Sequence, residues 1–148
     1  MKAIGAILVI LALVIGIVPQ FTDCLAQGKA ITLPNGNTMP MKCHWTRQAE
    51  VAVALPLLAV GVLMILSRRK ATQRALAVVG IALGAAAILI PAYLIGVCAS
   101  DEMICSMLMK PTLLFAGALT VAVNGIALVY LRGPDEEPAY PGELGTAA

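Results

Sequence analysis

The chain has 148 residues, of which 60% are hydrophobic and 12% are charged, and its formal net charge is +2. This composition is far more apolar than that of a soluble globular domain of the same length, so we expect a membrane protein. The net charge is too small, and its basic cluster too localised, for nucleic-acid binding.

Four segments are apolar enough to be membrane helices, since a helix needs about 20 apolar residues to cross the hydrocarbon core. Their apolar runs, residues 3–21, 49–66, 75–97 and 111–131, contain one charged residue, Glu50. They show neither the charged face of a soluble bundle nor the alternation of a membrane β-barrel. We therefore predict an all-α membrane protein with four transmembrane helices in a domain of residues 1–132. The predicted helices cover about residues 3–21, 46–66, 73–97 and 111–131.

The first apolar segment directly follows Met1 and Lys2, as it would in a secretory signal peptide. Its length of about 19 residues exceeds that of a usual signal core, so we expect it to be retained as the first helix. The residues from Phe21 to Cys24 lack the leucine expected before a lipidated cysteine, which argues against a lipoprotein.

A polar loop over residues 22–45 should separate the first two helices. It contains Asn35-Gly36, a strong signal for a tight hairpin turn, with arms over residues 29–33 and 37–41. Pro34, just after the first arm, and Pro40, within the second, cannot donate ladder hydrogen bonds, so the predicted β-hairpin is short and would need a clamp in water.

The four cysteines fall in this loop and in a second predicted outer loop over residues 98–110. Cys24 and Cys43 flank the hairpin, where a disulfide would close it and add about 3 kcal/mol of stability. We favour this pair together with Cys98–Cys105. Because four cysteines allow three pairings, a bond between the loops, such as Cys43 with Cys98 or Cys105, stays open.

Polar and aromatic residues mark the start of the second helix. Trp45 lies where an indole would anchor the helix at the membrane interface. Thr46 is a plausible N-cap, and Glu50 lies one turn inside, where the helix dipole favours an acidic side chain.

The third and fourth helices carry residues suited to helix–helix contact. Gly80 and Gly84 form a small-residue face that allows close packing, within the bundle or with a partner. Asn124 is the notable polar residue of the fourth helix. We expect it to form an interhelical hydrogen bond, with a substrate or ion path as the alternative.

The orientation follows from basic residues near the helix ends, because the cytoplasmic side collects them. Residues 67–74 hold four basic residues in one short connection, so we predict a multi-pass protein of the cell membrane with both termini in the cytoplasm. All four cysteines would then face an oxidising exterior. Residues 133–148 are acidic and rich in proline, and should form a disordered cytoplasmic tail.

Soft ligands on the predicted outer side make metal handling an alternative function, because Met and Cys side chains select Cu(I). A thiol–disulfide redox function is another alternative, although six residues separate Cys98 from Cys105 and eighteen separate Cys24 from Cys43, too many for a typical reducible pair. The candidate copper ligands are Met39, Met41, Cys43, His44, Met103 and Cys105.

No phosphate-binding loop, nucleophile elbow or carboxylate pair indicates an enzyme, and no cofactor is expected. We therefore predict a non-enzymatic accessory or structural subunit of a larger membrane complex. Its partners would be the lipid bilayer and a homo- or hetero-oligomeric membrane protein, contacted through the outer loops and the small-residue helix faces.

The stretch Met41-Lys42-Cys43-His44-Trp45-Thr46, with the later Cys98 and Cys105, resembles a family of small four-helix prokaryotic membrane proteins of uncharacterised function. The resemblance covers residues 1 to about 132. It implies that the Lys-Cys-His-Trp-Thr motif opens the second helix and that the second cysteine pair ends the third helix and its loop. It also implies an association with ABC-type permeases of the lipoprotein and macrolide export class.

Overall fold

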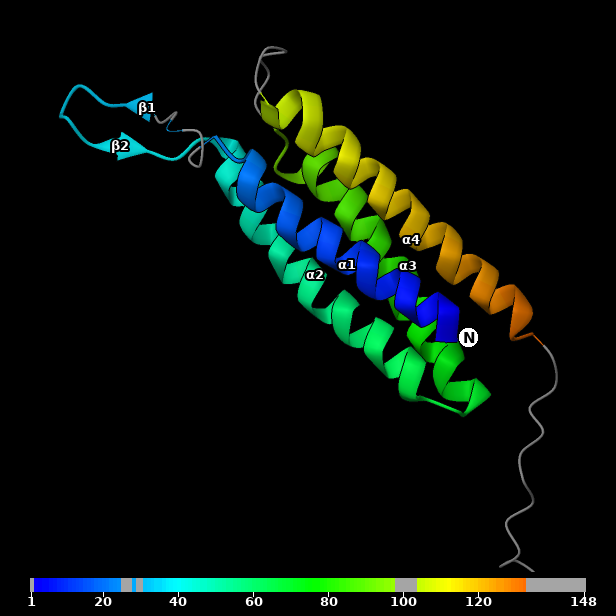
Figure 1. The fold of residues 1–148 in the computed structure, drawn as a ribbon. Coiled ribbons are helices and arrows are strands. Elements are labelled where there is room, and N and C mark those ends of the chain that lie inside the picture. Colours follow the sequence, from blue (N-terminus) through cyan, green and yellow to red (C-terminus); the bar gives the residue numbers. More distant parts are fainter. Residues whose placement is uncertain (1, 25–27, 29–30, 98–103, 133–148) are drawn as a thin grey trace, which may run out of the picture.

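A computed structural model describes residues 2–24, 28, 31–97 and 104–132 of the chain. In these residues, four long helices lie side by side in one elongated bundle, with successive helices running in opposite directions (Figure 1). All four are long and apolar enough to cross a membrane. This confirms the predicted all-α, four-helix architecture and indicates a multi-pass membrane protein.

The four long helices are α1 (Lys2–Thr22), α2 (Lys42–Leu66), α3 (Lys70–Leu89) and α4 (Lys110–Tyr130). A π-helical turn, η1 (Ile90–Leu94), extends α3, and a second one, η2 (Cys105–Met109), precedes α4. With 21 residues, α1 is about 31 Å long, which matches a hydrocarbon core of about 30 Å. The predicted tail, residues 133–148, lies outside the described residues.

The predicted hairpin is present as two short antiparallel strands, β1 (Ile31–Thr32) and β2 (Thr38–Met39). Gly36 occupies the turn with φ = 82°, a conformation that glycine adopts without the steric cost borne by other residues. Figure 1 shows the hairpin projecting away from the end of the bundle. The strands are exposed, so the bundle does not bury them.

Helices α1 and α2 form one closely packed pair, and α3 and α4 form another. In the first pair, a Cβ atom added to Gly5 would lie 2.6 Å from Cγ1 of Ile65. In the second, a Cβ atom added to Gly117 would lie 2.7 Å from Cγ1 of Ile88. Glycine therefore permits both close approaches, as small residues do in membrane helix pairs.

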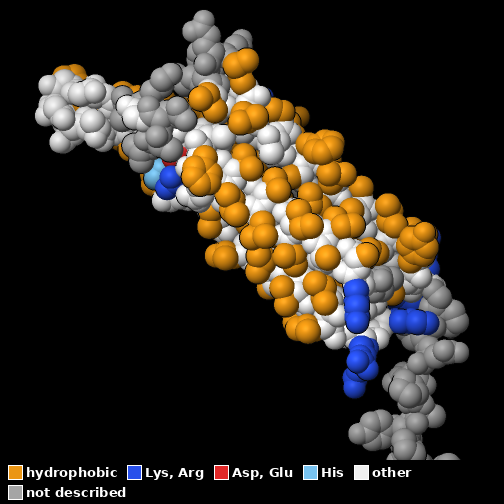
Figure 2. Space-filling model, in the orientation of Figure 1, with side chains coloured by type: hydrophobic (Ala, Val, Ile, Leu, Met, Phe, Trp, Pro, Cys, Tyr) orange, Lys and Arg blue, Asp and Glu red, His pale blue; other side chains and the backbone are white. Residues whose placement is uncertain are grey.

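The outer surface of the bundle is largely apolar, as Figure 2 shows for one face. Large hydrophobic side chains are exposed on every long helix, including Ile10, Leu55, Val78 and Phe115. Exposed Lys and Arg side chains of residues 68–70 gather at the end where α2 turns into α3. We call this the basic end, and the positive-inside rule predicts that it faces the cytoplasm.

Candidate metal centre

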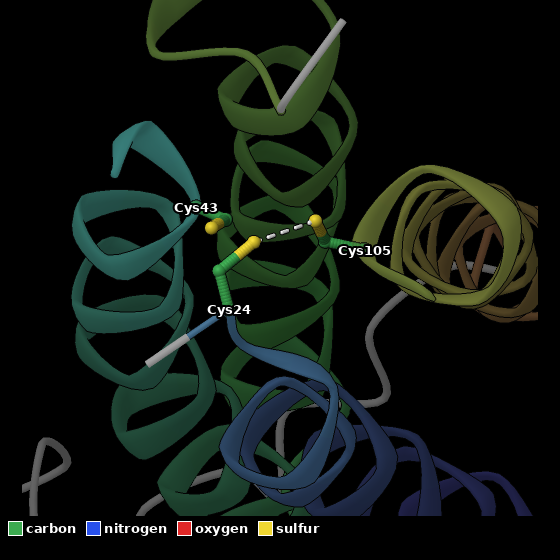
Figure 3. A group of neighbouring side chains, drawn as sticks. All are labelled: Cys24, Cys43 and Cys105. Carbon is green, nitrogen blue, oxygen red and sulfur yellow. Dashed lines mark hydrogen bonds between the residues drawn. The ribbon is translucent and has the colours of Figure 1, made fainter. Parts of the chain in front are cut away.

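The opposite end of the bundle brings together Cys24, Cys43 and Cys105, which we call the cysteine centre (Figure 3). Their three sulfur atoms all lie within 4.8 Å of one another. The exposed fractions of the residues are 4% for Cys24, 0% for Cys43 and 1% for Cys105. A compact and nearly dry group of sulfur atoms is therefore built from residues far apart in the sequence.

Three different elements position these sulfurs. Cys24 lies two residues beyond the end of α1, Cys43 is the second residue of α2, and Cys105 is the first residue of η2. The chain reverses between α1 and α2 and between α3 and α4, so the end of α1 and the starts of α2 and η2 meet at the same end of the bundle (Figure 1). The antiparallel topology thus assembles the centre without needing a local sequence motif.

The described residues do not support the predicted disulfide-closed hairpin. The sulfur of Cys24 lies 3.1 Å from that of Cys105, whereas a disulfide bond is about 2.05 Å long. The structure shows no disulfide between Cys24 and Cys43. These two cysteines turn inward from the helix ends to Cys105, so they do not clamp the projecting hairpin. The other predicted pair includes Cys98, which lies outside the described residues.

A charged cluster adjoins the cysteine centre along the chain. The buried carboxylate of Asp23, the residue before Cys24, has Oδ2 3.3 Å from Nδ1 of His44 and 3.4 Å from a guanidinium nitrogen of Arg47. On the other side of the imidazole, Nε2 lies 3.5 Å from the amide nitrogen of Gln48. His44 is thus held between two side chains, with Nδ1 donating to Asp23 when Nε2 accepts from Gln48.

The predicted copper ligands are only partly brought together. Cys43 and Cys105 belong to the centre, while Met39 is exposed on β2 and His44 is directed to Asp23. Met41 is half-buried against the same apolar cluster. Met103 lies outside the described residues.

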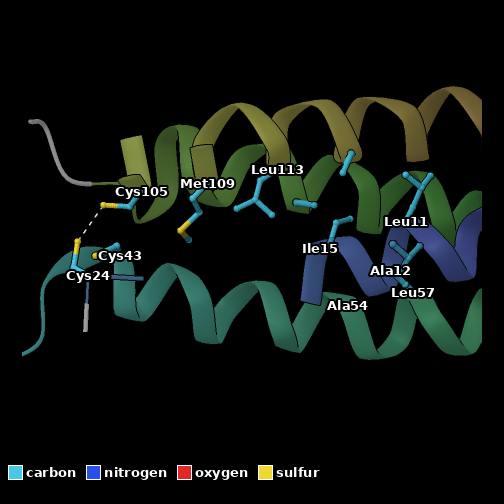
Figure 4. Close-up of a cluster of buried hydrophobic side chains, with 12 residues drawn as sticks. Leu11, Ala12, Ile15, Cys24, Cys43, Ala54, Leu57, Cys105, Met109 and Leu113 are labelled. Carbon is cyan, nitrogen blue, oxygen red and sulfur yellow. Dashed lines mark hydrogen bonds between the residues drawn. The ribbon is translucent and has the colours of Figure 1, made fainter. Parts of the chain in front are cut away.

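Sequence reasoning did not consider Cys24 as a metal ligand, and it counted Met109 among the soft side chains of the outer loop but not in the candidate ligand set. Met109 is completely buried in the cluster that contains the three cysteines, and Figure 4 shows its side chain between Cys105 and Leu113 along the bundle. Its spacing of four residues from both Cys105 and Leu113 is the signal that could have placed it on their face.

Thr46 links the start of α2 to the chain that follows η1. The helix begins at Lys42, four residues before the predicted start, so Thr46 lies within it and is not the N-cap. Its hydroxyl donates a hydrogen bond of 2.6 Å to the carbonyl oxygen of Gly96. The bond connects α2 with the α3 side of the bundle near the cysteine centre.

The remaining predicted site residues lie apart from the cysteine centre. Trp45 is exposed and meets the His44 ring edge-on, with ring centroids 5.9 Å apart. Glu50 is completely buried on α2, and neither of its carboxyl oxygens has a hydrogen-bond partner among the described residues.

Asn124, Gly80 and Gly84 lie where α3 meets α4. The amide nitrogen of Asn124 donates to the carbonyl oxygen of Thr120 within α4, at 2.8 Å, so this bond is not interhelical. The amide oxygen has no hydrogen-bond partner among the described residues. A Cβ atom on Gly80 would lie 2.5 Å from that oxygen, so glycine makes room for the amide, while Gly84 packs against Thr120.

A family model described as a domain of unknown function, DUF4418, matches residues 4–130. The chain belongs to this family. A search of curated proteins and a search of solved structures each gave no significant match. The match covers all four helices and the cysteine centre, so the DUF4418 domain and the described bundle are the same unit.

Proposed function

We propose that this DUF4418 protein is a non-enzymatic, membrane-embedded binder of a thiophilic metal ion, held by Cys24, Cys43 and Cys105. The observation that carries the proposal is the distance of at most 4.8 Å between any two of the three sulfur atoms. A metal–thiolate bond is about 2.3 Å long, so three sulfurs around one ion are separated by about 3.8–4.0 Å. Small side-chain movements would bring the cysteine centre to these separations.

The surroundings support a soft ion rather than a hard one. Hard cations such as Mg²⁺ and Ca²⁺ prefer oxygen ligands, whereas thiolates select Cu(I), Zn(II) and similar ions. The described His, Asp and Glu side chains contribute no donor atom to the cysteine centre. The donor atoms of the cysteine centre are therefore all sulfur atoms.

The location supports contact with an extracytoplasmic supply of the ion. The cysteine centre lies at the end opposite to the basic end, which the positive-inside rule assigns to the cytoplasm. On this orientation, an ion from outside the cell would meet the site before it meets the apolar length of the bundle.

Metal stoichiometry tests the proposal. The full chain, purified in detergent and reduced without oxygen, should bind one Cu(I) or Zn(II) ion per chain. Replacing any one of the three cysteines by alanine should abolish stoichiometric binding. Ser106→Ala, which changes the residue next to Cys105 but removes no sulfur, is the matched control. A reduced wild-type protein that binds neither ion would refute the proposal.

A thiol–disulfide function is the second candidate, favoured by the 3.1 Å distance between the sulfurs of Cys24 and Cys105. Two thiols would lose two electrons and two protons to a disulfide oxidant, which would become two thiols. The spacing argument against a redox pair concerned neighbours in the sequence, and this pair joins separate helices.

The accessory-subunit role is compatible with either chemistry and remains a separate proposal. The projecting hairpin offers an exposed surface for a partner, with Ile31 and Met39 exposed on paired positions. Isolation of the full chain in a gentle detergent should yield a stoichiometric partner protein, such as an ABC-type permease. A chain that is isolated alone would contradict this role.

A further inference from the structure

We infer that the ion is Cu(I) and that the thioether of Met109 is an additional ligand, which gives the cysteine centre a preference for Cu(I) over Zn(II). The inference rests on the proposed metal-binding function and specifies its cargo. It assigns a role to a side chain that the three-cysteine group does not include.

Met109 lies on the inner side of the cysteine centre. It is the last residue of η2 and has an exposed fraction of 0%. It belongs to the same buried cluster as the three cysteines, and in Figure 4 its side chain follows Cys105 along the bundle, before Leu113. A flexible, polarisable thioether is therefore buried next along the bundle from Cys105, where the centre meets the apolar core.

Cys105 and Met109 share a face because they are four residues apart, the spacing of one face of a helix. The N–H of Lys110 donates to the carbonyl oxygen of Cys105, which closes a wide turn of five residues. Both residues are buried in the bundle. Met107, between them, points outward and is exposed. Single π-helical turns of this kind occur frequently at functional sites.

Nitrogen and oxygen donors for a fourth ligand are missing from the described part of the centre. Zn(II) in a buried site is almost always four-coordinate, with Cys, His or carboxylate ligands. Both ring nitrogens of His44 already face other side chains, Asp23 and Gln48, and the Asp23 carboxylate faces His44 and Arg47. Neither residue belongs to the group of donor atoms within 4.8 Å.

Cu(I) does not have this requirement. It is a soft ion that binds with about two to four sulfur ligands, thioethers among them. Three buried sulfurs with a thioether on their inner side therefore suit Cu(I), while Zn(II) would find an incomplete shell among the residues that the structure describes. Met41 also packs on the cluster, but it is half-buried at the outer margin, so the buried Met109 is the better placed thioether.

Competition binding on the full chain tests the selectivity. Cu(I) and Zn(II) affinities would be measured on reduced protein in detergent, against a chelator of known affinity for each ion. Met109→Leu keeps the volume and apolar character of the side chain but removes the sulfur. It should weaken Cu(I) binding by about 10-fold or more, comparable with the loss of other tuning residues at metal sites, and leave Zn(II) binding unchanged.

Met64→Leu is the matched control, because Met64 is equally buried but belongs to the other core cluster. It should change neither affinity. Equal Cu(I) affinities of Met109→Leu and Met64→Leu, or a wild-type preference for Zn(II), would overturn this inference and leave the metal-binding function intact. Failure of the wild-type protein to bind either ion would overturn both.

X-ray absorption at the copper edge gives a second readout that does not depend on the stability of a variant. The wild-type spectrum should contain a sulfur contribution beyond three thiolates, and Met109→Leu should lose it. A purely structural role of Met109 would not change the number of sulfur ligands. A wild-type spectrum that fits three or fewer sulfurs, or includes nitrogen ligands, would overturn the assignment of Met109.

Discussion

The sulfur of Cys24, just beyond the last turn of α1, lies 3.1 Å from the sulfur of Cys105 at the start of η2. This contact joins the first helix to the last one, across 81 positions of the sequence. It therefore links the end of α1 to the start of η2, which a disulfide between Cys24 and Cys43 would not have linked.

Mild oxidation should form a disulfide between Cys24 and Cys105. The purified full chain would be treated with a small disulfide oxidant, and the linked peptides would be identified by mass spectrometry. Cys43→Ser should retain the bond, whereas Cys105→Ser should lose it. Prior loading with metal should slow the reaction, because coordinated thiolates are less available for attack. A Cys24–Cys43 bond as the main product would contradict this geometry.

Replacement of Glu50 by leucine should raise the thermal stability of the protein. Both carboxyl oxygens are buried without a hydrogen-bond partner in the described chain, and an unpaired buried polar group costs about 1–3 kcal/mol. Thermal unfolding in detergent should show a melting temperature higher by several degrees. Gln48→Leu, at an exposed position of the same helix, is the control and should have little effect. A lower melting temperature for Glu50→Leu would show that the carboxyl group has a stabilising partner.

Gly80→Ala should destabilise the α3–α4 pair. The added methyl group would lie 2.5 Å from Oδ1 of Asn124, and overpacking of this kind costs about 1–3 kcal/mol. Gly125→Ala is a matched control, because no atom lies within 4 Å of its added Cβ. Combining Gly80→Ala with Asn124→Ala should recover part of the loss, as measured by thermal unfolding. An equal loss of thermal stability in Gly80→Ala and Gly125→Ala would argue against the close approach of Gly80 to Asn124.

Thr46→Val should weaken the link between α2 and Gly96. The substitution keeps the shape of the side chain but removes the donor of a 2.6 Å hydrogen bond, which should cost about 1 kcal/mol. Thr112→Val provides the comparison, because the Thr112 hydroxyl is exposed and donates within its own helix, to Leu108. Hydrogen exchange should increase near the start of α2 for Thr46→Val only. Equal exchange in both variants would contradict a tertiary role for this bond.

The orientation of the protein in the membrane can be tested by labelling cysteines introduced at the two ends of the bundle. A cysteine introduced at Gly36, in a variant without the native cysteines, should react in intact cells with a reagent that cannot cross the membrane. A cysteine at Arg69 should react only after the cells are opened, because the positive-inside rule assigns the basic end to the cytoplasm. The reverse pattern would mean that the cysteine centre faces the cytoplasm, where thiols stay reduced.

The helices were predictable because each is a continuous apolar run, and Asn35-Gly36 was enough to predict the short hairpin. The cysteine pairing was not predictable in the same way. Distance along the chain suggested Cys24 with Cys43, whereas helix packing brings the sulfur of Cys24 within 3.1 Å of that of Cys105. Which helix ends become neighbours depends on tertiary contacts that no local pattern records.

The ligand set was only partly accessible from the sequence. Met39 and Met109 have the same chemistry, yet one is exposed on the hairpin and the other is fully buried. Met109 lies four residues before the buried Leu113, which places both on one face of a helix, but this spacing alone does not show that the face is buried. Choosing among seven methionines therefore required the three-dimensional structure.

The π-helical turn η2 accommodates one residue more than an ordinary α-helical turn would. If this segment relaxed to a regular α-helix, Cys105 would rotate by about 100° about the axis of α4, the angle that one residue occupies in such a helix. Cys105 would then swing away from Cys24 and Cys43 while Leu113 kept its place in the core. Whether the three sulfurs meet thus depends on whether this single turn is π-helical or α-helical. A change between these two forms can assemble or dismantle the cysteine centre without moving the helices apart.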